Sequence, residues 1–187
     1  MPNKNAIGYR PTWAEVNLDH LAHNFKEARS LLSPKTKILV TVKADAYGHG
    51  LVEVAKRLVA CRVDYLGVAS IDEGIKLRKA GIQVPILLLG LVLKKDIGPL
   101  FTYRLIPTVC NRMMACALSV KAAALRQRIP VHIKVDTGMG RIGVLPSEVL
   151  KLATDIWKLK HIQLQGIFTH FPLADSDRKF TIKQINL

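Results

Sequence analysis

Six short apolar runs, each followed by a stretch with helical character, constrain the fold of this chain more than any other feature. The runs begin every 20 to 33 residues, at 38–42, 65–69, 85–89, 106–110, 131–135 and 164–169. Runs of this length, rich in Val, Ile and Leu, are typical of parallel strands buried on both faces. Their alternation with helical stretches predicts repeated βα units joined by right-handed crossovers.

The stretches between the runs carry several kinds of helix signal. Residues 51–60 place apolar side chains at helical spacing, and residues 72–80 begin with acids and stop at Gly81. Residues 111–127 are rich in alanine, and residues 147–158 follow Pro146, a good helix opener. We also expect an amphipathic helix over 18–32, preceded by a weak strand-like alternation over 12–18.

The number of units leaves two architectures open. A closed (β/α)8 barrel needs eight strands and about 250 residues, whereas this chain has 187 residues and six apolar runs. It fits either an open, doubly wound sheet or a TIM-type barrel truncated to about six parallel βα units. In both architectures, ligands bind at the carboxyl ends of the strands.

Composition and charge narrow the range of functions. The hydrophobic fraction of 49% is enough for a globular core, and no apolar run reaches the ~18 residues that would span a bilayer. The N-terminus has no apolar signal core, so we expect a cytoplasmic protein without a membrane partner. The net charge of +14 permits nucleic-acid binding, but the basic residues are scattered and no recognition motif accompanies them. The three cysteines form no C-x-x-C pair, so no metal site is expected.

Lys43 ends the first apolar run, within the sequence Val-Lys-Ala-Asp-Ala-Tyr-Gly-His-Gly at residues 42–50. The end of a buried parallel strand would carry its amine to the rim where α/β proteins bind ligands. A desolvated lysine amine loses its proton readily, which Schiff-base chemistry requires. A lysine at a strand end more often extends to water, so position alone leaves both interpretations open.

A glycine-rich turn follows the run at 131–135. Gly138 and Gly140 allow the backbone to turn sharply, and Arg141 then offers a planar fork that suits a carboxylate or phenolate. The alternative for Arg141 is an ordinary surface position. Lys134 lies within an apolar strand, where an unpaired ammonium is costly, so we expect a negative group nearby, with Asp136 as one candidate. His170, after the last run, fits either a site or a satisfied strand end.

These motifs resemble those of alanine racemases, which bind pyridoxal phosphate. The resemblance rests on residues 10–18, 42–50, 69–74, 134–143 and 166–171, and therefore extends over essentially the whole chain. It implies that residues 1–187 are the N-terminal part of the cofactor-binding barrel. The remaining barrel units and the β-rich second domain of the family would be absent from this sequence.

The resemblance also implies roles for individual residues. Lys43 would carry the cofactor and act as base or acid on one face of the substrate Cα, and Tyr47 would lie near the cofactor phosphate. Arg141 would contact the cofactor's phenolic oxygen and help to place the substrate carboxylate. Lys134, carbamylated in some members, would support Arg141, and His170 would lie beside the pyridine ring.

The activity implied is the interconversion of L-alanine and D-alanine, which supplies D-alanine for peptidoglycan. The family acts as a homodimer, and its base on the opposite face is a tyrosine from the second domain. We therefore expect this chain alone to be weakly active or inactive. Two alternatives stay open: a single-domain pyridoxal-phosphate-binding barrel that manages the cofactor without racemising, and a basic nucleic-acid-binding domain.

Overall fold

The computed structural model describes residues 12–187, so Arg10 and Pro11 of the opening motif lie outside the described residues. Six strands form within this range, and each overlaps one of the six apolar runs. They are β1 (Leu39–Thr41), β2 (Tyr65–Val68), β3 (Ile86–Leu88), β4 (Thr108–Val109), β5 (Ile129–Lys134) and β6 (Ile162–Phe168). Every pairing between neighbouring strands is parallel, as the alternation predicts.

The order of the strands decides between the two architectures. β1, β2 and β3 pair in sequence order, as do β4, β5 and β6. The two groups are joined by a parallel bridge between Leu87 and Ile106, where the Leu88 N–H donates to the Ile106 carbonyl at 2.9 Å. A doubly wound sheet reverses its order at a switch point, whereas this order runs from β1 to β6 without reversal. The prediction of a partial TIM-type barrel is confirmed, and the open doubly wound sheet is wrong.

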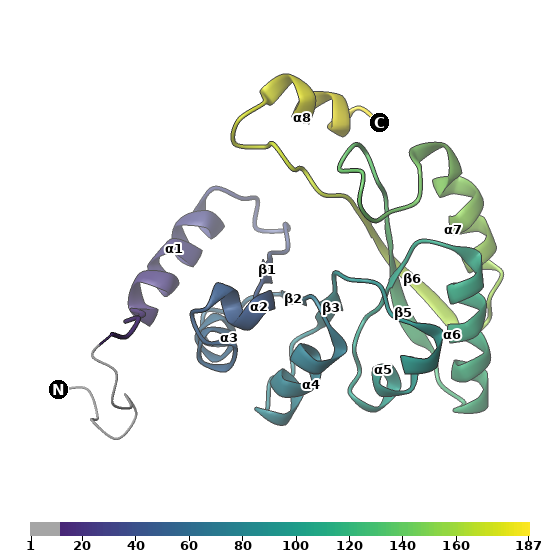
Figure 1. Ribbon diagram of the computed structural model, residues 1–187, viewed down its shortest axis with the longest axis horizontal. Helices are drawn as coiled ribbons and strands as arrows, with labels where there is room; N and C mark the ends of the chain where they lie inside the picture. The colour runs from purple at the N-terminus through teal and green to yellow at the C-terminus, as the bar shows by residue number, and fades with distance from the viewer. Residues whose placement is uncertain (1–11) are drawn as a thin grey trace.

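Helices pack around the outside of the curved row of strands (Figure 1). Five of them match the predicted helices to within a few residues: α1 (Leu18–Ser30), α3 (Leu51–Ala60), α4 (Ile71–Lys79), α6 (Arg112–Ala124) and α7 (Val149–Trp157). The sequence did not predict the short helices α2 (Lys43–Tyr47), α5 (Gly98–Thr102) and α8 (Arg178–Ile185), or the 3-10 turns η2 (Lys94–Asp96) and η3 (Pro146–Glu148). None of the helices in the described part of the chain is long and apolar enough to cross a membrane.

Side-chain caps explain where several helices begin. The Asn17 carboxamide oxygen accepts hydrogen bonds from the N–H groups of Asp19 and His20, at 2.8 and 3.1 Å. Ser70, Asn111 and Asp177 cap α4, α6 and α8 in the same way. Residues 12–17 form no strand. The weak alternation over 12–18 was therefore misleading, because this segment leads into the cap of α1.

The apolar core lies between the strands and the outer helices. Leu66 and Ile86 from the strands and Leu77, Leu118 and Ile156 from the helices are fully buried there. The inner faces of the strands line a cavity instead. Burial alternates along β6, and Ile167 is 53% exposed. The expectation of burial on both faces therefore fails for β6, because only its outer side is covered by helices within residues 12–187. It fails for β1 as well, since all three residues of that strand are only partly buried and Leu39 and Thr41 line the cavity.

Candidate active site

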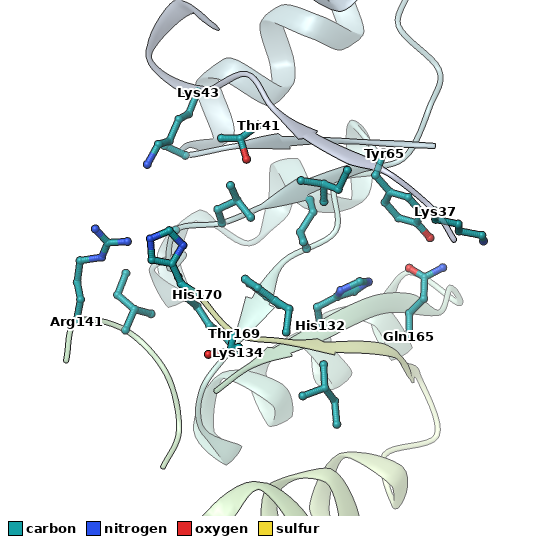
Figure 2. A pocket seen from close by; sticks show the side chains of 18 of the residues that line it. Lys37, Thr41, Lys43, Tyr65, His132, Lys134, Arg141, Gln165, Thr169 and His170 are labelled. Carbon is teal, nitrogen blue, oxygen red and sulfur yellow. The ribbon is translucent and has the colours of Figure 1, made fainter. Parts of the chain in front are cut away.

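A cavity of about 780 Å³ lies against the inner faces of the strands (Figure 2). All of the side chains to which the resemblance assigned a role line it: Lys43, Tyr47, Lys134, Arg141 and His170. In Figure 2, Lys43 and Arg141 extend toward one another at one end of the cavity, with the His170 ring beside the Arg141 guanidinium. Residues that are distant in sequence therefore share one basic end of the cavity.

Lys43 lies two residues beyond the end of β1, at the strand's carboxyl end as the sequence predicts. The preceding residue, Val42, is buried, and its N–H donates to the Gly67 carbonyl of β2 at 2.8 Å. The Lys43 side chain is half-buried, and its Nζ lies 5.9 Å from the centroid of the Tyr47 ring, within the range of a cation–π contact. Tyr47 itself is 60% exposed, which places it at the rim of the cavity.

The turn that follows Lys43 is left-handed, a feature that the sequence did not predict. Ala44, Asp45, Ala46 and Tyr47 have φ values of 52° to 55°. For residues other than glycine, this conformation costs about 1–2 kcal/mol per residue. Contacts from outside the turn offset this cost. The Asp45 carboxylate accepts a hydrogen bond from the Leu51 N–H at 2.9 Å, which is the main reason that its pKa is lowered.

Lys134 is the more deeply buried lysine of the site. It is 5% exposed, and burial, followed by the nearby charge of Arg141, lowers its pKa. The sequence placed the desolvated amine at Lys43, but the structure assigns the stronger burial to Lys134. No ion pair joins Lys134 to Asp136 within residues 12–187, although the nearby negative charge of Asp136 acts against the lowering of the Lys134 pKa. The Asp136 carboxylate instead accepts hydrogen bonds from backbone N–H groups.

Asp136 organises the loop that presents Arg141. Its carboxylate accepts hydrogen bonds from the N–H groups of Gly138 and Gly140, at 2.9 and 3.0 Å. These bonds lower the pKa of Asp136. The base of the loop is closed by the Asp136 N–H, which donates to the Val144 carbonyl at 2.9 Å. Arg141 is therefore carried on a loop with fixed ends, as the glycine spacing indicates.

His170 follows β6, and its backbone accepts a hydrogen bond from a side chain of α8. The Nε2 of Gln184 donates to the His170 carbonyl at 3.2 Å and to the Thr137 hydroxyl at 3.0 Å. Gln184 is almost fully buried, and its two hydrogen bonds join the segments that follow β5 and β6. Burial, followed by the charges of Arg141 and the two lysines, lowers the pKa of His170. The sequence analysis did not single out Gln184. The signal that could have found its helix is Asp177, whose carboxylate caps α8 by accepting a hydrogen bond from the Phe180 N–H.

The far end of the cavity has a different character. His132 lies between the rings of Tyr65 and Phe168, at centroid distances of 6.4 and 6.3 Å, and burial lowers its pKa. Its Nε2 is buried without a hydrogen-bond partner among the described residues. The cavity thus combines a cationic rim with an interior of aromatic and apolar groups. This combination suits a planar ligand that carries negative groups at one end.

Parallel strands in sequential order, a lysine at the end of the first strand and a cationic rim define a ligand-binding protein of the βα-barrel class. The family model described as "Alanine racemase, N-terminal domain" matches residues 16–187. The chain belongs to this family.

Relatives with known names agree with this placement. The chain is 47% identical over 176 residues to an alanine racemase of Halothermothrix orenii, a match that covers 94% of this chain and 46% of the relative. An alanine racemase of Clostridium difficile, solved in complex with cycloserine, matches with a TM-score of 0.91 at 43% identity, covering 95% of this chain and 50% of that one. A histidine racemase of Leuconostoc mesenteroides gives a TM-score of 0.82 at 26% identity, with coverages of 90% and 46%. The chain thus spans about half the length of the relatives it matches.

We predict that Gly143→Ala damages the Arg141 loop far more than Gly140→Ala does. Gly143 has a φ of +150°, and an added Cβ would lie 2.3 Å from the Asp136 nitrogen. Gly140 has a φ of +69°, but nothing lies within 4 Å of an added Cβ. We expect a loss on the order of 3 kcal/mol in the free energy of unfolding for Gly143→Ala and about 1–2 kcal/mol for Gly140→Ala. Urea denaturation measures both, and equal losses would contradict the close approach.

The lowered pKa of Asp136 predicts a stabilisation that depends on pH. Because the folded pKa lies below the unfolded value of about 3.9, the stabilisation is complete above that value and disappears as the pH falls through the folded pKa. Asp136→Asn should therefore lower the free energy of unfolding at pH 7, and the gap from wild type should shrink toward pH 3. A gap that stays constant between pH 7 and pH 3 would show that the carboxylate charge does not hold the loop.

Proposed function

We propose that this chain is the cofactor-binding barrel portion of a pyridoxal-phosphate-dependent alanine racemase. The observation that carries the proposal is the convergence of Lys43, Lys134, Arg141 and His170 on one cavity, in a chain whose relatives are named racemases. As proposed domain limits, residues 1–187 correspond to the N-terminal part of that barrel. The rest of the barrel and the β-rich domain would belong to sequence beyond this portion.

The side chains present fit the cofactor. Pyridoxal phosphate is planar and anionic, and the cavity offers basic side chains at one end and the aromatic rings of Tyr65 and Phe168 elsewhere in its lining. When bound, the cofactor supplies an electron sink for the charge that is left when Cα loses its proton. Lys43 would hold it covalently, Tyr47 would lie near its phosphate, and Arg141 would meet its phenolic oxygen.

The protein side chains would bind the substrate and move its proton. The Lys43 Nζ would accept the Cα proton on one face of the amino acid and return a proton to that same face. Arg141 would hold the substrate carboxylate through paired hydrogen bonds. A lowered pKa lets Lys134 give up its proton more readily. A neutral or carbamylated Lys134 would no longer repel Arg141, and could therefore support it.

Racemisation also requires a base on the opposite face of Cα. The family resemblance implies a tyrosine of the second domain, contributed across a homodimer. We therefore propose that this portion alone binds cofactor and amino acid but turns over poorly. In the whole protein, the activity would supply D-alanine for peptidoglycan in the cytoplasm. A histidine racemase shares this fold at 26% identity, so the fold alone does not set the choice of amino acid.

We predict that pyridoxal phosphate, trapped with borohydride, labels the chain at Lys43. Peptide mapping by mass spectrometry identifies the modified lysine. Lys43→Arg should abolish the label, because the guanidinium does not form the covalent bond. Lys37→Arg is the matched control, since Lys37 lines the far end of the same cavity, and it should keep the label. A label that is found mainly at another lysine would overturn the site assignment.

Hydrogen exchange at Cα distinguishes a racemase portion from a barrel that only manages the cofactor. A chain with Lys43 as its single base should exchange the Cα hydrogen of one alanine enantiomer in deuterated water and leave the other enantiomer unchanged. Mass spectrometry after separation on a chiral column measures both. Cofactor binding without exchange in either enantiomer would favour the cofactor-managing alternative. Rapid interconversion of the two enantiomers would show that the opposite-face base is present in this chain.

A further inference from the structure

The carboxylate of Glu73 bridges the two backbone segments that follow β1 and β2, next to Lys43. One oxygen accepts a hydrogen bond from the Ala44 N–H at 2.6 Å, and the other accepts one from the Ala69 N–H at 2.7 Å. Ala44 follows Lys43, and Ala69 follows β2. Glu73 lies in the first turn of α4 and is half-buried. One side chain therefore joins the backbones that continue from β1 and β2.

This use of Glu73 differs from its expected role at a helix start. Ser70 and Glu73 have the spacing of a capping box, in which the glutamate bonds back to the N–H of the capping residue. Ser70 fulfils its half, because its Oγ accepts from the Glu73 N–H at 3.3 Å. The Glu73 carboxylate extends further, to Ala69 and Ala44. The helix start thus supplies a charged acceptor to the turn that follows Lys43.

The bond to Ala44 acts where the backbone is under strain. Ala44 is the first of the four residues with left-handed φ values. The first N–H groups of any helical turn have no partner within that turn, so they need acceptors from elsewhere. A carboxylate that accepts backbone N–H bonds is a strong acceptor of this kind. Glu73 therefore stabilises the left-handed conformation at its first residue.

Lys43 is consequently fixed on both sides. Its preceding residue, Val42, is bonded to Gly67 through its N–H, and its following residue, Ala44, is bonded to Glu73. These two bonds set the direction of the Lys43 Cα–Cβ bond, and with it the path of the side chain into the cavity. Glu73 does not line the cavity. Its direct link to Lys43 is therefore the hydrogen bond to the neighbouring Ala44 N–H.

We infer that Glu73 is a positioning residue that aims the Lys43 amine into the cavity by holding the peptide bond between Lys43 and Ala44. The inference deepens the proposed function and rests on it for the role of Lys43. The bond itself is independent of that role. Catalysis and covalent binding tolerate little misplacement of the reacting group, since an error of 1 Å can cost about 100-fold in rate. Loss of the bond should therefore change which lysine reacts, as well as how fast.

The test compares Glu73→Gln and Glu73→Ala with Asp72→Asn. Asp72 lies in the same turn of α4 and is exposed, so its replacement gives a matched loss of charge without loss of the bridge. Labelling by pyridoxal phosphate and borohydride is followed over time, and the modified lysines are counted. We expect the rate at Lys43 to fall about tenfold or more in the Glu73 variants. The share of label at other lysines, Lys134 among them, should rise. Asp72→Asn should behave as wild type.

A uniform fall at every lysine, with no change in the share at Lys43, would indicate general loss of structure and would overturn the positioning role. Glu73→Gln keeps one acceptor oxygen and should therefore retain more selectivity for Lys43 than Glu73→Ala. Equal selectivity in wild type and Glu73→Ala would also overturn the inference.

A second measurement does not depend on the cofactor. Amide hydrogen exchange is measured by NMR on isotopically labelled protein without cofactor. The Ala44 and Ala69 amides should lose their protection against exchange in Glu73→Ala and keep it in Asp72→Asn. Unchanged protection of Ala44 in Glu73→Ala would overturn the inference even if Lys43 binds the cofactor. Lost protection, combined with wild-type labelling at a lysine other than 43, would instead refute the proposed function and leave the bridge established.

Discussion

Parallel pairing in strict sequence order is the constraint on which the rest of this structure depends. Because β1 to β6 all run the same way, their carboxyl ends meet at one rim, and the segments that follow them are brought together. Lys43 follows β1, the Arg141 loop follows β5, and His170 follows β6. Their positions along the chain are far apart, but each is only a few residues beyond a strand. The site is thus a direct result of the topology.

The same topology gathers positive charge, and the structure manages it in several ways. Lys43, Lys134 and Arg141 all act on the pKa of His170, so these groups are close enough to repel one another. Burial shifts Lys134 toward its neutral form, and the Asp136 carboxylate accepts its hydrogen bonds from the backbone of the loop. The remaining positive charges face the cavity, where an anionic ligand would reduce the repulsion between them.

Much of this fold could be predicted from the sequence because its signals are local. Each apolar run became a strand, and the capped, amphipathic stretches became helices. The left-handed turn could not be predicted, because Ala44 and Ala46 have no intrinsic preference for it. It is held by Glu73 and Leu51, whose contacts exist only once the chain is folded. Glu73 itself looks like an ordinary acid in a helix start. Its hydrogen bonds to Ala44 and Ala69 form only when β1 and β2 lie side by side.

The site residues also differ in whether a local signal in the sequence marks them. Lys43 and Arg141 were recognisable because they stand directly after an apolar run or a glycine turn. Gln184 was not, since a polar residue in a short helix carries no such signal. Its amide nevertheless joins the Thr137 hydroxyl to the His170 carbonyl. For anyone who expresses a shorter piece of this polypeptide, that link sets a boundary: a piece that stops before α8 would lose the amide that joins Thr137 to His170.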